Sequence, residues 1–250
     1  MTEKEILGCI NDGALTLYTM LGDAPHMNCV NNDCYTIISP KSGEQGAHTV
    51  FNVSLEQLTD EKAMEKINEI KGLNLHTWWN IDYSDRIYRI LHGQDRLPVI
   101  ERANDEEVYM ALLPSRKPLY NIITKDISVK KVDNPQQFEL WANIVNNIYE
   151  AGYPIVHPVH HYHHCQSGAM TCYLGFYKGV PASVISALHH DDISALYFLG
   201  TLEGFRKKGL ARAASSVAVD ETFKKGSKII GSTVWAAAKP LADSLGFEVY

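Results

Sequence analysis

The segment that decides the fold of this chain is LYFLGTLEGFRKKGLAR, residues 196–212. Its apolar start is typical of a buried strand, and a glycine-bearing turn with three consecutive cationic residues leads into a helical pattern from Gly209. The first N–H groups of a helix have no acceptor within the helix, and they lie at the positive end of its dipole. With the cationic side chains beside them, these groups predict a site for an anion that carries phosphates.

Three kinds of phosphate-binding turn compete for this segment. It lacks the G-x-x-x-x-G-K-[ST] pattern that cradles nucleoside triphosphates, and it lacks the G-x-G-x-x-G pattern of dinucleotide folds. The spacing R-x-x-G-x-A, from Arg206 to Ala211, remains. Gly209 permits a backbone conformation closed to other residues, and Ala211 leaves room for a bulky group against the helix start.

Length and composition describe a folded globular chain. Of its 250 residues, 45% are hydrophobic and 21% are charged, which excludes disordered, collagen-like and coiled-coil proteins. No apolar run approaches the roughly 18 residues of a membrane-spanning helix, and the charged start is unlike a secretory signal. The five cysteines are an odd number spread thinly along the chain, so we expect free thiols in a cytoplasmic protein without a disulfide framework.

The formal net charge of −6 is unevenly distributed. All of the acidic excess lies in residues 1–125, whereas residues 126–250 hold equal numbers of acidic and basic residues. A protein that binds nucleic acid would instead present a broad basic face. The one concentrated basic cluster, from Arg206 to Arg212, suits a small polyanion, and we expect neither nucleic-acid nor membrane partners.

Strand and helix patterns alternate clearly in the second half of the chain. Residues 127–132 predict a strand, and the helix that follows has Asp133 or Asn134 as its cap and Pro135 at its first position. The later elements are strands over 170–177, 180–188 and 193–201 with turns at 178–179 and 189–192, a helix over 209–225, a strand over 229–234, a helix over 236–244 and a strand over 247–250. The predicted order is β, α, β, β, β, α, β, α, β.

The first half holds similar pieces with weaker boundaries. We expect helices over 4–21 and 84–92, a capped helix within 54–71, and strands over 34–38, 49–53, 73–81 and 108–113. The two prolines at 114 and 118 interrupt the pattern. A domain boundary is therefore expected within residues 114–126.

The R-x-x-G-x-A spacing, in this context, resembles the pyrophosphate-binding loop of the GNAT superfamily, the acyl-CoA-dependent N-acyltransferases. The order of elements in residues 126–250 and the closing Leu245-Gly246-Phe247 are also similar to that family. Residues 25–30 and Thr77-Trp78-Trp79 resemble, more loosely, features of two-lobed members.

The resemblance implies an α/β fold with α+β mixed sheets, built as two GNAT-like lobes in tandem. Residues 126–250 would be a complete GNAT domain that binds acetyl-CoA, with central strands that splay apart. Residues 1–120 would be a degenerate GNAT-like lobe without a phosphate loop, and an unrelated α/β domain is the alternative for this half.

The resemblance also implies roles for individual residues. In the family, the strand before the loop pairs with the pantetheine arm of CoA, and Gly200 is consistent with a β-bulge in that strand. The pyrophosphate would lie on the loop backbone, with Lys207, Lys208 or Arg212 reaching the ribose phosphate. The implied CoA-binding residues are Leu199, Gly200, Thr201, Arg206, Lys207, Lys208, Gly209, Leu210, Ala211 and Arg212.

Catalysis in such enzymes rests mainly on positioning an amine beside the thioester, with a base for its proton and often an acid for the departing thiolate. Here the family's frequent tyrosine acid position holds Ala242, and the position of the glutamate base of some members falls near Ala195. Asp243 and Ser244 adjoin the empty acid position. Tyr197 shares the strand face of Ala195 and is the candidate catalytic residue, with a core role as its alternative.

A histidine-rich stretch, HPVHHYHHC over residues 157–165, is the second unusual feature. The pairs His157 with His161 and His160 with His164 have the i, i+4 spacing of a helical metal site, although the proline after His157 disfavours a helix there. The alternatives are a histidine that orients or deprotonates the acceptor amine, and a partly solvated loop. Because no H-E-x-x-H or paired C-x-x-C motif supports a metal centre, we expect no metal.

The leading hypothesis is an N-acetyltransferase that moves an acetyl group from acetyl-CoA to a small-molecule or peptide amine. Residues 126–250 would bind CoA, and the first lobe would complete the acceptor pocket, where its acidic charge favours a cationic acceptor. Two alternatives are a non-catalytic CoA-sensing or protein-interaction module and a metal-binding regulator built on the histidine stretch. An oligomer is compatible with the sequence.

Overall fold

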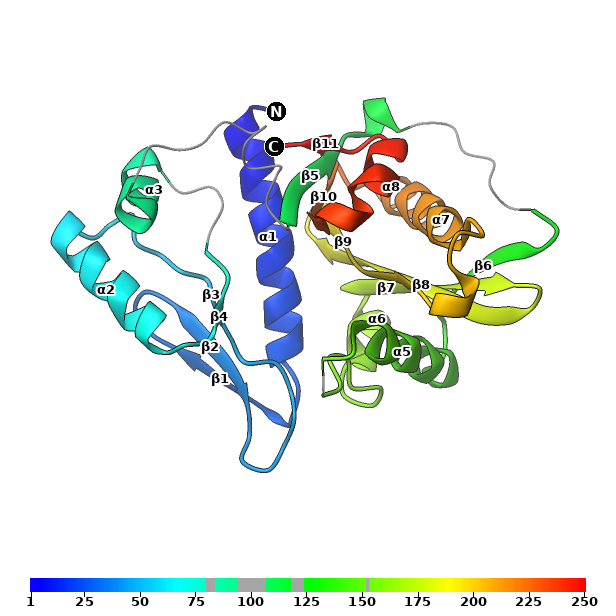
Figure 1. The fold of residues 1–250 in the computed structure, drawn as a ribbon, viewed down its shortest axis with the longest axis horizontal. Helices are drawn as coiled ribbons and strands as arrows, with labels where there is room; N and C mark the ends of the chain where they lie inside the picture. Colours follow the sequence, from blue (N-terminus) through cyan, green and yellow to red (C-terminus); the bar gives the residue numbers. More distant parts are fainter. Residues whose placement is uncertain (80–83, 94–106, 118–123, 152) are drawn as a thin grey trace.

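The computed structural model describes the 250-residue chain except residues 80–83, 94–106, 118–123 and 152. Two β-sheets lie on either side of one long helix, α1 (Glu3–Gly22), as Figure 1 shows. Thr2 caps this helix and forms a reciprocal capping box with Glu5. The buried face of α1 contacts β-strands from both sheets, so the helix joins the two halves of the molecule.

The larger sheet holds the predicted phosphate-loop strand near its centre. Within the described residues it has seven strands, in the spatial order β11 (Glu248–Val249), β5 (Glu107–Leu112), β10 (Ile229–Trp235), β9 (Ile193–Thr201), β8 (Val180–His190), β7 (Met170–Tyr177) and β6 (Ile127–Lys131). Neighbouring strands are antiparallel except β9 and β10, which are parallel. The prediction of a mixed sheet is confirmed.

Helices cover both faces of the larger sheet. On one face lie α1, α5 (Pro135–Tyr149) and α6 (Tyr162–Ser167), and on the other lie α7 (Leu210–Lys224) and α8 (Lys239–Ser244). The two-residue period of the strands sorts the core accordingly. On β7, Cys172 and Leu174 belong to the core beneath α1 and α5, whereas Tyr173 between them belongs to the core beneath α7.

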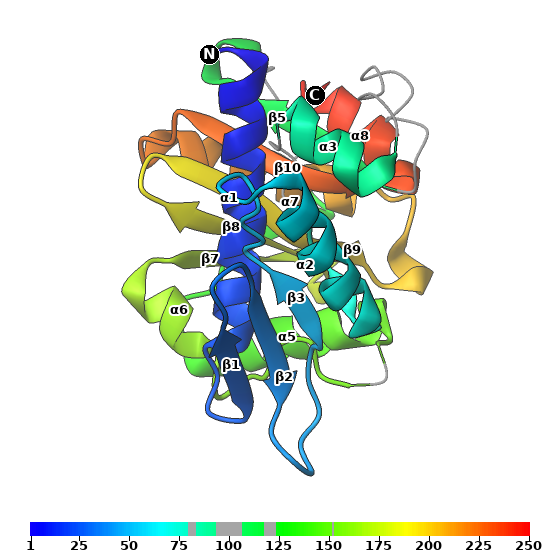
Figure 2. The same cartoon turned by 90° about the vertical axis from the view of Figure 1, so that its left-hand side faces the viewer.

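The smaller sheet belongs wholly to the first half of the chain. Its strands, in spatial order, are β1 (Met27–Asn31), β2 (Thr36–Pro40), β3 (Thr49–Phe51) and β4 (His76–Thr77). Figure 2 views this half from outside and shows α2 (Asp60–Gly72) and α3 (Asp85–His92) beside these strands. Val50, Ile67 and Ile87 form the centre of the core that they share.

Most elements of the second half lie where the sequence predicts them. Strands β7 and β9 have the predicted bounds, and the turn between β7 and β8 uses Lys178 and Gly179, both with positive φ. Asn134 is the cap of α5, because its side chain accepts a hydrogen bond from the Gln137 N–H, and Pro135 is the first helical residue. The described residues also form three short 3₁₀ helices, at Pro114–Arg116, Glu203–Phe205 and Ala236–Ala238.

Four sequence expectations are corrected. His189 and His190 belong to β8, so the turn before β9 is confined to Asp191 and Asp192. Helix α6 forms within the histidine-rich stretch, and β1 forms over residues 27–31, where no strand was expected. Of the strand expected over 73–81, only His76–Thr77 is a strand, and residues 80 and 81 lie outside the described part.

Strand β5 comes from the first half of the chain but lies in the larger sheet, between β10 and β11. It pairs with β10 from Ile230 to Trp235 along the edge of β10 opposite β9, and therefore satisfies an edge that would otherwise be open. Residues 118–123 of the expected domain boundary lie outside the described part. The division into residues 1–120 and 126–250 stays a prediction, and α1 and β5 are shared structure across it.

All five cysteines are free thiols, as expected. A search of the described helices finds none with the length and apolar character needed to cross a bilayer.

Candidate functional site

Strands β9 and β10 separate at the centre of the larger sheet. Their parallel pairing ends at Ala195 and Gly231, although β9 continues to Thr201 and β10 to Trp235. At the vertex, the Ser232 hydroxyl donates a hydrogen bond to the Leu196 carbonyl oxygen across a distance of 3.0 Å. Beyond this point one edge of β9 faces a gap, and the prediction of splayed central strands is confirmed.

A β-bulge bends β9 beside the gap. Val184 of β8 pairs with Gly200 of β9, and Ser186 of β8 pairs with Tyr197 of β9. Two steps along β8 therefore correspond to three steps along β9, so β9 holds one extra residue. Phe198 within this stretch has a φ of 55°, which is uncommon for a bulky residue. The bulge therefore lies at Phe198 and not at Gly200, where the sequence suggested it.

Gly200 has a different reason to be glycine. A Cβ atom at this position would lie 2.8 Å from Cδ1 of Ile148, because α5 packs closely against β9 here. The Gly200 carbonyl oxygen accepts a hydrogen bond from the Ser183 hydroxyl at 2.7 Å. The Thr201 carbonyl oxygen accepts a hydrogen bond from Arg206 Nε at 3.1 Å. These contacts hold β9 in place without help from β10, so its edge beside the gap is held ready for a ligand.

The loop between β9 and α7 presents a run of backbone N–H groups. Gly209 caps α7 with a φ of 86° and no side-chain hydrogen bond, and Lys207 has a φ of 61°. Ala213 is the first residue of α7 whose N–H has a backbone acceptor, the Gly209 carbonyl oxygen at 3.0 Å. Within the described part of the chain, the N–H groups of residues 207–212 have no hydrogen-bond acceptor. Such a concave run at a helix N-terminus favours an anion.

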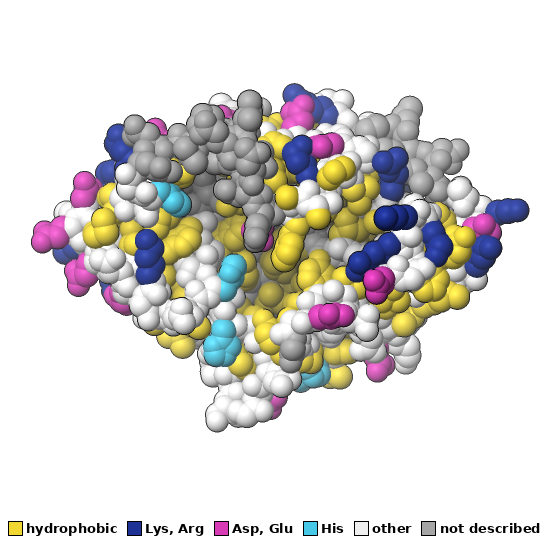
Figure 3. Space-filling view, viewed as in Figure 1, with side chains coloured by type: hydrophobic (Ala, Val, Ile, Leu, Met, Phe, Trp, Pro, Cys, Tyr) yellow, Lys and Arg dark blue, Asp and Glu magenta, His cyan; other side chains and the backbone are white. Residues whose placement is uncertain are grey.

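The four cationic side chains of the loop divide into two pairs. Arg206 donates to the Thr201 carbonyl, and Lys208 donates to the Gly204 carbonyl at 2.6 Å while lying over the Phe205 ring. Lys207 and Arg212 are exposed, and among the described residues neither side chain has a polar partner. The first pair stabilises the loop, and the second pair is available to a ligand. Figure 3 shows lysine and arginine side chains gathered to the right of a central hollow, over the half that holds α7.

Leu210 and Ala211 contribute backbone to the loop, not side-chain chemistry. The Leu210 side chain is buried with Ile127, Ala182 and Ala213 in a small core directly beneath the helix start. This anchoring fixes where the first N–H groups of α7 point. The structure therefore brings together the loop residues that the sequence singled out.

Aromatic side chains from distant positions in the chain gather around Tyr18 of α1. The Tyr18 ring lies 5.6 Å from Phe51 and 5.9 Å from Trp78, and its hydroxyl lies 3.2 Å from Nε2 of His76. Burial is the main cause that raises the pKa of Tyr18, and Tyr197 and Glu107 nearby raise it further. Trp78 itself is a core residue, as expected, and donates its indole N–H to Asn11.

Tyr197 faces this aromatic group. It packs against the core beneath α1 and α5, and burial raises the pKa of its phenol well above the ordinary value. The phenol therefore stays protonated at neutral pH and can donate a proton or a hydrogen bond. Sequence reasoning could not find the rest of the group, because α1, β3 and β4 supply it from distant positions.

Neighbouring positions offer no conventional acid or base. Ala242 is buried in the core beneath α7, and the Asp243 carboxylate forms an ion pair with Lys239 at 2.9 Å. Ala195 lies against Gly13 of α1. A Cβ atom added at Gly13 would lie 2.6 Å from the Ala195 Cβ. A longer side chain at position 195 would push α1 off the sheet, so a glutamate base is sterically excluded here.

The helical histidine pairs that the sequence spacing offered do not form. Helix α6 starts only at Tyr162, and the ring of His161 instead accepts a hydrogen bond at Nδ1 from the backbone N–H of His157. Both ring nitrogens of His189 are occupied, Nδ1 by the Ser194 hydroxyl and Nε2 by the Thr171 hydroxyl, each at 2.9 Å. His189 therefore has a structural role and no free nitrogen for base catalysis.

His189 makes the folded chain sensitive to acid. Burial, and then Lys225 and Lys131, lower its pKa from 6.5 to about 4. Below pH 6.5 the His189 side chain is protonated in the unfolded chain but stays neutral in the folded chain. The contribution of neutral His189 to the free energy of unfolding is therefore complete above pH 6.5 and is lost as the pH falls toward 4.

We expect His189→Gln to lose less stability than wild type between pH 7 and 4 in urea unfolding. The exposed His48→Gln variant should follow wild type, and equal losses in all three proteins would contradict the prediction.

Comparison with known proteins finds likeness in structure only. No protein-family model matches the chain, and no curated protein matches its sequence. A GCN5-related N-acetyltransferase from Kribbella flavida is 14% identical, with 95% of this chain and 91% of that chain covered and a TM-score of 0.61. A GCN5-related N-acetyltransferase from Sphaerobacter thermophilus is 12% identical, with 100% and 91% covered and a TM-score of 0.59. At these identities the likeness establishes the fold, and it extends over both halves of the chain.

Proposed function

We propose that this chain, which has the fold of the GCN5-related N-acetyltransferases, transfers an acetyl group from acetyl-CoA to an amine. One observation carries the proposal: backbone N–H groups of residues 207–212 lie unpaired, among the described residues, beside a gap between two parting strands. A diphosphate and an extended thiol arm need these two features side by side. An isolated helix start would offer only the first.

CoA would bind along this route in three parts. Its diphosphate would accept hydrogen bonds from the loop N–H groups, and Lys207 and Arg212 would reach its other phosphate. Its pantetheine arm would pair with the edge of β9 over residues 199–201, which faces the gap. The thioester would then lie at the vertex near Tyr197.

The reaction we propose is direct attack by a neutral amine on the thioester carbonyl carbon. A C–N bond forms, the C–S bond breaks, and the thiolate takes a proton while the amine nitrogen loses one. The protonated phenol of Tyr197 donates the proton to the thiolate. His76, whose Nε2 lies 3.2 Å from the Tyr18 hydroxyl, is the titratable group placed to accept the amine proton.

The acceptor class we propose is a cationic amine, either a small molecule or a peptide. Tyr109 and Tyr197 lie near Tyr18, and Glu107 raises the pKa values of Tyr18 and Tyr197, which is consistent with a negative charge nearby. Aromatic faces and a carboxylate attract a cation. The acidic first half of the chain is consistent with this class.

The first half of the chain supports a further part of the proposal, that residues 1–120 are a degenerate copy of the same fold. The order β1, β2, β3, α2, β4, α3, β5 matches β7, β8, β9, α7, β10, α8, β11, and in both sheets the third strand pairs in parallel with the fourth. At the position of the phosphate loop, however, Thr59 fills the helix cap with its own side chain. Asp60 and Glu61 in the first turn would repel a phosphate.

Titration of CoA by calorimetry, followed by thiol release from acetyl-CoA over a panel of cationic amines, tests the function. We expect CoA binding and turnover of at least one amine. Absence of CoA binding at hundreds of micromolar would overturn the proposal. Tight CoA binding without turnover of any amine would instead support a non-catalytic module. The cytoplasmic location stays a prediction from the sequence.

Replacing Tyr197 with phenylalanine should lower kcat about 10- to 100-fold and leave the Kd for CoA unchanged, because only proton donation is lost. The control is Tyr173→Phe, a buried tyrosine of the same sheet whose side chain lies in the core beneath α7. Thiol-release kinetics provide the measurement. Equal kcat values for Tyr197→Phe and Tyr173→Phe would rule out a role for Tyr197 in the reaction.

A further inference from the structure

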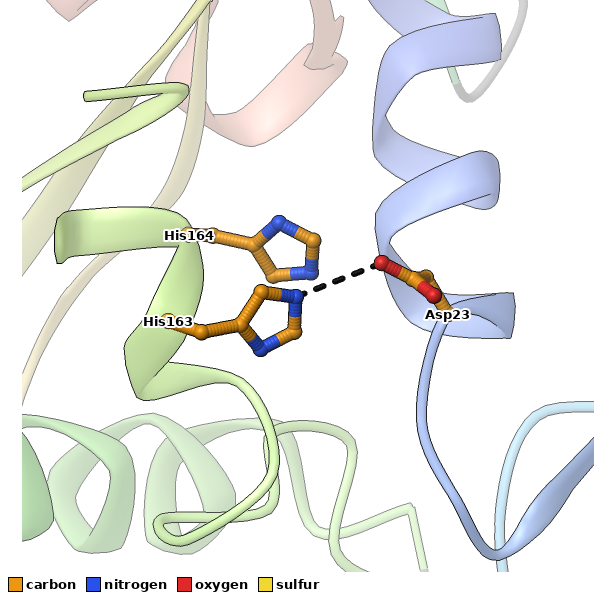
Figure 4. A group of neighbouring side chains, drawn as sticks. All are labelled: Asp23, His163 and His164. Carbon is orange, nitrogen blue, oxygen red and sulfur yellow. Dashed lines mark hydrogen bonds and ion pairs between the residues drawn. The ribbon is translucent and has the colours of Figure 1, made fainter. Parts of the chain in front are cut away.

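Asp23, His163 and His164 meet at the boundary between the two halves of the chain. Asp23 is the C-cap of α1, and both histidines belong to α6. One ligand atom from each residue lies within 4.8 Å of the others. Figure 4 shows the two imidazole rings one above the other, each with a nitrogen turned toward the Asp23 carboxylate.

Hydrogen bonding decides which nitrogen of His163 carries a proton. Its Nδ1 lies 2.6 Å from the His160 carbonyl oxygen, which can only accept, so Nδ1 is the donor. In a neutral ring Nε2 then presents a lone pair, yet it faces Oδ2 of Asp23 at 3.2 Å. Two acceptors face one another, and a cation must lie between them. That cation is either a proton on His163 or a metal ion.

His164 favours the metal ion. Its side chain is buried, and its Nε2 has no hydrogen-bond partner among the described residues. The ring centroids of His163 and His164 lie 3.9 Å apart. A proton on His163 would satisfy Asp23 alone, whereas a metal ion would satisfy all three side chains.

We propose that Asp23, His163 and His164 bind a divalent transition-metal ion of the zinc class. Two imidazoles and one carboxylate form a donor set that suits Zn²⁺. The His160 carbonyl already holds the remote nitrogen of His163, as the outer partner of a metal-bound histidine does.

The geometry needs a small closure to receive the ion. Ligand atoms in a tetrahedral zinc site lie roughly 3.4 Å apart, so the side chains must approach by about 1 Å. Asp23 and His163 are both exposed, which leaves room for this movement. An open cavity of about 580 Å³, lined in part by Asp23, His160, His163 and Cys29, adjoins the site. Water from this cavity can therefore complete the coordination.

The ligand set could not be found in the sequence, from which we expected no metal. Spacing pointed to His157 with His161 and His160 with His164, and the structure uses neither pair. It adds Asp23, which is 140 residues from His163. A metal ion here would tie the end of α1 to α6 and hold the two halves of the chain together, independently of acyl transfer.

Zinc titration of the full-length, tag-free protein, after treatment with a chelator, tests the proposal. We expect one Zn²⁺ per chain by calorimetry, visible absorption bands of four-coordinate cobalt on Co²⁺ substitution, and a Tm about 5 °C or more higher at a Zn²⁺ concentration about 100 times the Kd. Asp23→Asn and His163→Gln should each weaken Zn²⁺ binding at least about tenfold. Both side chains are exposed, so both variants should fold, which circular dichroism verifies.

The matched control is the other exposed histidine–aspartate pair, His190 and Asp191, whose side chains lie 3.8 Å apart. The double variant H190Q/D191N should bind Zn²⁺ as wild type does. Absence of Zn²⁺ binding at micromolar concentration would overturn the proposal and leave a protonated His163 paired with Asp23. Unchanged affinity in folded Asp23→Asn protein, or equal weakening in the control, would also overturn it.

Discussion

The Gly209→Asp variant should bind CoA at least about 100-fold more weakly than wild type while remaining folded. Gly209 has a φ of 86°, and no side chain caps α7. Aspartate tolerates this left-handed conformation better than most residues, and at a helix cap its carboxylate accepts hydrogen bonds from the second or third N–H of the helix. Those N–H groups belong to Ala211 and Arg212, which the diphosphate needs. The variant thus replaces the ligand with its own carboxylate.

Charge adds to this competition. A carboxylate within about 4 Å of a diphosphate repels it by roughly 1 to 4 kcal/mol, depending on exposure to solvent. Because the new side chain also satisfies the helix start, the free energy of unfolding should change little, so loss of binding would not reflect loss of structure. Calorimetric titration of CoA, with urea unfolding in parallel, measures both quantities.

Gly226→Asp is the matched control for this prediction. Gly226 also has positive φ, at 103°, follows the opposite end of α7, and has open space around its missing Cβ. The control introduces a similar strain and the same charge about one helix length away from the loop. We expect it to bind CoA as wild type does. Equal affinity of Gly209→Asp and wild type would remove the basis for the proposed CoA site.

Replacing Gly13 with alanine should destabilise the folded chain by about 1–3 kcal/mol, although alanine is the better helix former. Gly13 lies in the middle of α1, where an added Cβ would come within 2.6 Å of the Ala195 Cβ. That neighbour belongs to a central strand and has no flexible end that could move away. The helix must therefore shift off the sheet.

Gly72→Ala is the control with the opposite expected sign. Gly72 ends α2, and a Cβ there would meet nothing within 4 Å. Alanine should stabilise this position by about 0.5–1 kcal/mol, because it restricts the unfolded chain. Urea unfolding of both variants measures the difference. Stabilisation by Gly13→Ala would show that α1 is not held against Ala195.

Local signals explain why so much of the second half could be predicted. Asn134 and Pro135 start a helix, and Lys178 and Gly179 form a tight hairpin turn, because each conformation depends on residues only a few positions apart. The phosphate loop belongs to the same class, since Gly209 and the cationic residues before it are neighbours in the chain. The first half gave weaker signals, and its short strands β1 and β4 were missed or overextended.

Contacts between distant segments could not be predicted in this way. The insertion of β5 between β10 and β11 depends on pairing between the first half of the chain and the end of the second half. The glycine at position 200 serves the packing of Ile148, which no local pattern reveals. The aromatic group around Tyr18 likewise needs four elements to converge.

Apart from α6, the sequence alone determined the order of strands and helices in the second half, together with the loop that presents N–H groups to an anion. Backbone conformation near a glycine, a proline or a helix cap is decided by neighbours along the chain, so these features can be predicted from the local sequence. Only the tertiary structure decided that Gly13 meets Ala195 and that Asp23 meets His163. Such meetings depend on how whole helices and sheets pack, and packing sums small contributions from segments that lie far apart in the chain.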